Sequence, residues 1–313
     1  MTFALSLLLL LVSLALAPLL PGVINRVKAL TGGRQGRPLL QLYYDLAKLM
    51  RKSPVYPHAC SWFFRAAPAA GVASGLMALL LLPFGPVPSL IGFPGDFLLL
   101  AGLFALSRFT LILAALDTGS AFEGMGAARE ALFSGLAEPI FLFSLLILAL
   151  QAQAFSLSGM FGGLAPGLWT AGWPFYLMLS FALFLLLLPE NCRIPVDDPN
   201  TRLELTMTHE VMILDHSGPD LALLEYASAL KLWVFGLLIA GLLVPALAGP
   251  GGFVGPGPLL GGALCALALV FAVAVLVGLV ESLMARMRME RVPQVLTLAG
   301  SFACLAALSL WST

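Results

Sequence analysis

The stretch Leu259–Val280 reads LLGGALCALALVFAVAVLVGLV and contains no charged side chain. An α-helix of about 20 mostly apolar residues is long enough to cross the hydrocarbon core of a bilayer. The stretch therefore predicts a membrane-spanning helix.

The composition of the whole chain agrees with this prediction. Of the 313 residues, 60% are hydrophobic and 10% are charged, and the mean hydropathy is +1.00. Soluble domains carry about 25% charged residues, so this chain has too little polar surface to cover a globule in water. We expect an all-α integral membrane protein that forms a single polytopic membrane domain.

Seven other stretches have the length and apolar character of a span. The predicted spans are approximately residues 2–24, 69–91, 97–116, 132–155, 174–189, 228–247, 259–280 and 292–311. The first run lacks the positive residues that begin a signal peptide and exceeds the usual apolar region, so we expect it to be retained. No pair of segments resembles an internal repeat.

Nearly all Lys and Arg residues fall in alternate connections, namely residues 25–68, 117–131, 190–227 and 281–291. The other connections, around residues 83–96, 156–173 and 248–258, contain neither Lys nor Arg. Basic connections face the cytoplasm. The alternation therefore predicts that these four connections are cytoplasmic and that both termini lie outside.

The first basic connection contains an amphipathic segment, Pro38–Lys52. Its apolar residues recur at helical spacing, whereas Gln41, Asp45 and Lys48 fall largely on the other side. We expect a helix at the cytoplasmic interface, where its basic side chains reach lipid headgroups. A simple surface anchor is the alternative.

The third basic connection, Glu190–Tyr226, reads ENCRIPVDDPNTRLELTMTHEVMILDHSGPDLALLEY. Its carboxylates alternate with apolar side chains, which indicates a segment that packs against another surface. Acids beside apolar groups have raised pKa values and exchange protons nearer neutrality. A solvated acidic loop around a packed helix is the alternative.

Several familiar sites are excluded by the sequence. The spacing of His209, Glu210, Asp215 and His216 fits no metal-ligand pattern, and the four cysteines form no CxxC pair. Motifs for nucleotide binding or nucleophilic catalysis are missing, and no basic, aromatic-rich face suggests nucleic acid. We therefore expect no metal, no cofactor and no catalytic residue in this chain.

Four ionisable residues are predicted within or near the ends of spans: Arg108, Asp117, Glu138 and Glu281. An unpaired charge at membrane depth is costly, so such residues are functional candidates. Together they outline a polar path into the bilayer from the cytoplasmic side. The alternative is that each side chain extends to water at the interface.

Four motifs resemble one family. The run Glu190-Asn-Cys-Arg-Ile-Pro-Val-Asp197 resembles the ExxRxPxD signature of the membrane subunit that docks the peripheral arm of respiratory complex I. The matching subunit of membrane-bound NiFe hydrogenases belongs to the same family. The other motifs are Leu39-Leu-Gln41 with Asp45 and Lys48-Leu49, Gly126-Ala-Ala-Arg129 with Glu138, and Arg286-Met-Arg288-Met-Glu290.

Departures from the complex I pattern favour the hydrogenase branch. Asn200 and Arg202 replace two acids of the complex I loop that borders its quinone chamber, and only Glu204 matches. The segments 195–210 and 217–219 resemble the formate hydrogenlyase and hydrogenase-4 type of subunit instead. Those complexes pass electrons through iron–sulfur proteins to a NiFe site and need no quinone.

The resemblance implies a subunit that is not catalytic alone, anchors a soluble electron-transfer arm and helps couple redox chemistry to proton or ion movement. The expected coupling residues are Arg108, Asp117, Glu138, Glu190, Glu204, Glu210, Glu225 and Glu281. The expected docking residues are Gln41, Asp45, Arg129, Arg193, Pro195, Asp197, Asp198, Arg286 and Arg288.

The implied partners are hydrogenase large and small subunits, a ferredoxin-like iron–sulfur subunit and antiporter-like membrane subunits. The NiFe site and the iron–sulfur clusters belong to those partners, and the implied location is the cytoplasmic (inner) membrane of a prokaryote. Two alternatives stay open: the quinone-site subunit of a complex I-type oxidoreductase, and an independent secondary transporter.

Overall fold

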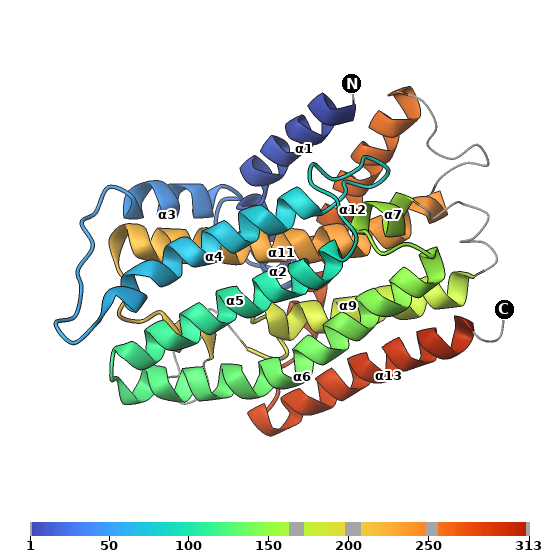
Figure 1. Cartoon of the computed structure of the whole chain (residues 1–313). Coiled ribbons are helices and arrows are strands. Elements are labelled where there is room, and N and C mark those ends of the chain that lie inside the picture. The colour runs from blue at the N-terminus through green and yellow to red at the C-terminus, as the bar shows by residue number, and fades with distance from the viewer. Residues whose placement is uncertain (1, 163–171, 198–207, 248–255, 311–313) are drawn as a thin grey trace.

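The computed structural model describes residues 2–162, 172–197, 208–247 and 256–310, and over these residues the chain is a bundle of helices without a β-strand (Figure 1). The helices are α1 Thr2–Leu16, α2 Leu19–Thr31, α3 Gln41–Leu49, α4 Trp62–Leu81, α5 Asp96–Asp117, α6 Ala121–Ala152, α7 Leu157–Gly162, α9 Trp173–Glu190, α10 His209–Met212, α11 Gly218–Leu247, α12 Pro256–Leu283, the 3₁₀ turn η1 Met289–Arg291 and α13 Val292–Leu310. Seven described helices are long and apolar enough to span a membrane, or eight when α1 and α2 count as one. The predicted class, an all-α multi-pass membrane protein, is confirmed.

The first predicted span is broken. α1 and α2 meet at an angle of 47°, where we had expected one continuous helix over residues 2–24. Pro18 causes the break, because its ring removes an N–H and clashes with the preceding turn of a helix.

Helix α4, which corresponds to the second predicted span at residues 69–91, begins and ends earlier in the sequence than we expect. α4 begins at Trp62, where the Ser61 hydroxyl accepts a hydrogen bond from the Phe63 N–H at 3.3 Å and caps the helix. It ends at Leu81, before the Pro- and Gly-rich connection that starts at Pro83. Hydropathy alone does not reveal the Ser61 cap that starts the helix or the connection that ends it.

Helix α6 extends farther back than its predicted span, because residues 121–131, which we had assigned to a connection, are helical. This part of α6 packs closely against Thr208 and α10. A Cβ at Gly126 would lie 2.9 Å from the Thr208 carbonyl oxygen, so only a glycine allows this approach. The family motif at residues 126–129 lies inside this helix.

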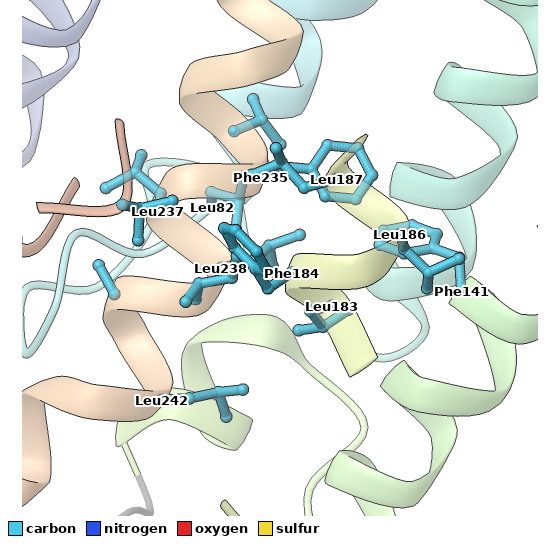
Figure 2. Packing of buried hydrophobic residues seen from close by; sticks show 14 of the residues in the cluster. Leu82, Phe141, Leu183, Phe184, Leu186, Leu187, Phe235, Leu237, Leu238 and Leu242 are labelled. Carbon is cyan, nitrogen blue, oxygen red and sulfur yellow. The ribbon is translucent and has the colours of Figure 1, made fainter. Parts of the chain in front are cut away.

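Helices α9 and α11 form the centre of the bundle, with nearly every side chain between Ala229 and Val244 buried. Figure 2 shows α11 residues Phe235 and Leu238 beside α9 residues Phe184 and Leu187. The remaining long helices surround this pair and keep many apolar side chains exposed, as a lipid-facing surface requires.

The two ends of the bundle differ in charge. We call the end formed by residues 25–61, 190–197, 208–217 and 284–291 the charged end; it holds most of the Lys and Arg side chains. Figure 1 shows α3 toward this end, while α1 begins and α13 ends toward the opposite one.

Candidate functional site

A cluster of five buried or partly buried ionisable side chains lies within the bundle. Arg108 of α5 contacts Glu190 at the end of α9 at 2.8 Å, Glu138 of α6 at 3.3 Å and Glu130 of α6 at 3.6 Å. Lys231 of α11 lies 2.8 Å from the same Glu190 carboxylate. Side chains of four helices, α5, α6, α9 and α11, therefore meet at one polar centre, which we call the central cluster.

The central cluster contains two cations and three carboxylates. When all five groups are ionised, one negative charge is not compensated inside the cluster. A net charge surrounded by apolar helices is costly. Uptake of one proton by a carboxylate makes the five groups electrically neutral.

An aromatic layer bounds the central cluster. Phe104, Phe141 and Phe235 pack with ring centroids 5.4 to 5.9 Å apart. They line a cavity of about 210 Å³ together with Arg108 and Glu138. The Glu138 side chain is 40% exposed, so this carboxylate is reachable from the side of the bundle between α5 and α6.

A larger cavity of about 500 Å³ opens at the charged end, between α2, α3, the residues after α9, α10 and α11. Its lining includes the predicted docking residues Gln41, Asp45, Arg193 and Asp197 and the predicted coupling residues Glu210 and Glu225. The structure thus places predicted docking residues and predicted coupling residues around the same cavity.

A narrow cavity of about 70 Å³ lies between the large cavity and the central cluster. It shares Asn191, Cys192, His209 and Ser228 with the large cavity. With the cavity of about 210 Å³ beside the aromatic layer it shares Phe104, Arg108 and Glu190. The three cavities therefore adjoin one another in a row from the charged end to Glu138, with these shared side chains between them.

The two titratable groups at the junction are uncharged near neutral pH. Burial lowers the pKa of His209 to about 4, with a smaller contribution from Lys231. Burial also raises the pKa of the Cys192 thiol well above its ordinary value. Neither side chain therefore places a charge at this junction near neutral pH.

Ion pairs join the connection after α9 to the end of α12. Glu281 lies 2.9 Å from Lys28 and 3.6 Å from Arg193, and Asp197 lies 2.8 Å from Arg286. The second Asp197 oxygen accepts a hydrogen bond from the Thr208 N–H at 2.8 Å. These predicted coupling and docking residues are therefore bonded within the chain.

The remaining predicted residues lie elsewhere. Asp117 accepts hydrogen bonds from the Ser61 N–H and hydroxyl at 2.6 and 2.9 Å, outside the row of cavities. Arg288 is exposed at the charged end, and Arg129 lies on α6 with Met125 Sδ 3.0 Å from its guanidinium. Pro195 accepts a backbone hydrogen bond from Met287. Asp198 and Glu204 lie outside the described residues.

Sequence reasoning missed Glu130 and Lys231 as members of the central cluster. Glu130 fell in a segment assigned to a connection, although its eight-residue spacing from Glu138 places both on one face of a continuous helix. Lys231 lies within the predicted span 228–247 but was not among the expected coupling residues. Over the described residues, no group of three or more His, Cys, Asp or Glu side chains is arranged to hold a metal.

Comparisons with known proteins agree with this architecture. Formate hydrogenlyase subunit 4 of Escherichia coli K12 is 32% identical over 303 residues, covering 96% of each chain. Hydrogenase-4 component C of the same organism is 33% identical over 296 residues, covering 94% of this chain and 91% of its own.

A solved structure shows the same fold at lower identity. In an archaeal membrane-bound sulfane sulfur reductase complex, one chain superposes with a TM-score of 0.76 at 19% identity, covering 97% of this chain and 99% of its own. The family model described as NADH dehydrogenase matches residues 3–311. The chain therefore belongs to the NADH dehydrogenase family of membrane subunits.

Proposed function

We propose that this chain is the membrane anchor and proton- or ion-coupling subunit of a membrane-bound NiFe hydrogenase complex of the formate hydrogenlyase type. Two relatives above 30% identity bear formate hydrogenlyase and hydrogenase-4 names. The observation that carries the coupling role is a central cluster with one surplus carboxylate at the end of a row of adjoining cavities.

The row of cavities supports a path for protons from the charged end. A proton enters the large cavity, crosses the junction beside His209 and reaches the carboxylates around Arg108. Binding there neutralises the surplus negative charge. Glu138 then passes the proton sideways, because its carboxylate is the one that is partly exposed between α5 and α6. Antiporter-like membrane subunits are the proposed recipients.

The charged end suits the docking of soluble subunits. The large cavity and the ion pairs of Asp197 and Glu281 lie at this end, so a charge that changes in a docked subunit acts on the mouth of the path. The proposed partners are hydrogenase large and small subunits and a ferredoxin-like subunit, which supply the NiFe site and the iron–sulfur clusters.

The proposed location is the cytoplasmic membrane of a prokaryote, with the charged end in the cytoplasm and both termini outside. The positive-inside rule supports this orientation. An independent transporter would need no such partners, and a quinone-reducing subunit would need access to the cavity from the bilayer.

Purification of the intact complex in mild detergent tests the proposal. Hydrogenase and iron–sulfur subunits should co-purify with this chain in stoichiometric amounts, and hydrogen-linked electron transfer should accompany them. Recovery of the chain alone with ion transport activity would support the transporter alternative. Recovery with quinone-reducing subunits and bound quinone would support the complex I alternative.

A further inference from the structure

The break between α1 and α2 removes helical hydrogen-bond partners from backbone carbonyls near the end of α1. Pro18 has no N–H to donate to the Leu14 carbonyl. The chain then turns, and the Leu20 N–H bonds to the Ala17 carbonyl at 3.2 Å. In a membrane, a carbonyl without a partner is costly, so the carbonyls of Leu14 and Ala15 require donors from elsewhere.

Two tyrosines from different helices supply those donors. The Tyr226 hydroxyl of α11 donates a hydrogen bond to the Leu14 carbonyl at 3.0 Å. The Tyr43 hydroxyl of α3 donates one to the Ala15 carbonyl. The two phenols therefore hold the end of α1 against both α3 and α11.

These bonds lie beside the wall of the large cavity. Leu42 and Glu225 line the cavity, while the next residue of each helix, Tyr43 and Tyr226, bonds to α1. The wall is also closed at α2, where a Cβ at Gly22 would lie only 2.1 Å from the Leu39 carbonyl oxygen. Helices α2, α3 and α11 thus line the cavity, and the two phenols join the end of α1 to α3 and α11.

The lining of the cavity matches an aqueous occupant. Besides its apolar positions, the cavity is lined by charged side chains of several segments, including Arg37, Lys48 and Lys52 beside Asp45 and Glu210. Such a lining is readily hydrated, whereas a long apolar tail would leave these charges poorly solvated.

We propose that Tyr43 and Tyr226 close the bilayer side of the large cavity, so that the cavity admits small water-borne species and excludes membrane-borne ligands such as isoprenoid quinones and phospholipids. The two residues determine which class of ligand enters. Access of ligands to the large cavity does not depend on whether the central cluster couples protons.

Thiol labelling of the intact complex in membranes tests the proposal. Ser228, which lines the cavity, is replaced by Cys in a chain whose Cys60, Cys192 and Cys265 are replaced by Ala. Cys304, exposed on α13, is retained as the internal control for a thiol facing lipid. The probes are a long-chain alkyl maleimide that partitions into the bilayer and a small charged maleimide in water.

With both tyrosines present, the alkyl maleimide should label Cys304 and leave the cavity thiol of Ser228→Cys unlabelled, whereas the small charged reagent should reach that thiol. Replacing Tyr43 and Tyr226 with Phe removes only the hydroxyls. The double variant should raise alkyl labelling of the cavity thiol several-fold, and Tyr44→Phe, at an exposed neighbour on α3, should not.

Two results would overturn the proposal: alkyl labelling of the cavity thiol as fast as that of Cys304 with both tyrosines present, or unchanged labelling in the double variant. If the double variant does not assemble, Tyr43→Phe and Tyr226→Phe are measured singly. Each should then give partial labelling, and no increase in either would equally contradict the proposal.

Discussion

Arg108 Nη2 lies 3.0 Å from one carboxylate oxygen of Glu190 and 2.8 Å from the other. Lys231 Nζ lies 2.8 Å from Glu190 as well, so a single carboxylate holds both cations of the central cluster. This arrangement makes Glu190 the residue on which the geometry of the cluster depends most.

Glu190→Gln should therefore destabilise the chain. Removing one partner of a buried ion pair costs about 3–5 kcal/mol, because the remaining charge is left in an apolar environment. We expect less assembled complex in membranes and a lower unfolding temperature of what remains. Glu290→Gln, at an exposed position of the charged end, is the matched control. Equal amounts of complex in both variants would show that Glu190 is dispensable for the cluster.

Glu138→Gln should separate assembly from coupling. The amide keeps the shape of the side chain but removes the titratable charge, and the half-exposed position tolerates it. We expect normal assembly and loss of ion uptake by vesicles, measured per assembled complex. Glu123→Gln provides a control on the same helix, because Glu123 is buried outside the row of cavities. Wild-type uptake with Glu138→Gln would remove this residue from the path.

Docking is best tested at Arg288 and not at Asp197. Asp197 bonds to Arg286 and Thr208 within the chain, so Asp197→Asn should lower stability before it affects a partner. Arg288 is exposed, and Arg288→Glu should reduce co-purification of the soluble subunits while the membrane part stays inserted. If Arg288→Glu retains the soluble arm fully, Arg288 does not contribute to docking.

Acid should destabilise the chain through His216. This imidazole is buried and stacks on Phe64 with ring centroids 3.9 Å apart. Burial lowers its pKa from 6.5 to about 4, so on acidification the unfolded chain binds the proton before the folded chain does. The free energy of unfolding is therefore unaffected by this imidazole above about pH 6.5. It falls progressively as the pH falls toward 4.

His216→Gln should therefore flatten the fall in unfolding temperature over this pH range, compared with His58→Gln at an exposed position. The quantity to compare is the difference in unfolding temperature between neutral and acid pH for each variant in detergent. The same slope in both variants would exclude His216 as a source of acid sensitivity.

Accessibility of introduced thiols tests the orientation. Cysteines at Ser89 or Ser158, which hydrogen-bond to each other in the connections free of Lys and Arg, should react with an impermeant reagent from outside sealed cells. A cysteine at Ser217, which bonds to Val55 at the charged end, should react only from the cytoplasm. Labelling of a cysteine at Ser217 from outside would contradict the predicted orientation.

The sequence by itself determined the class of the fold and the position of most helices. A run such as Leu259–Val280 cannot be hidden in a soluble domain of this size, and lipid imposes a helix on it because every backbone group must be paired internally. The alternation of basic connections then predicts that most Lys and Arg side chains lie at one end of the bundle. The motif around Arg193 and Pro195 indicated the family because its residues are close together in the sequence.

Only the tertiary structure decided which charges meet. Arg108, Glu130, Glu190 and Lys231 come from four helices, and their contacts depend on helix rotation and on an extension of α6 that hydropathy does not reveal. The contacts beside the bend at Pro18 likewise come from two other helices, whose Tyr43 and Tyr226 hydroxyls donate to the Ala15 and Leu14 carbonyls. Hydrophobic patterns record burial along one segment, whereas buried ion pairs and cavities are set by packing between segments that are distant in sequence.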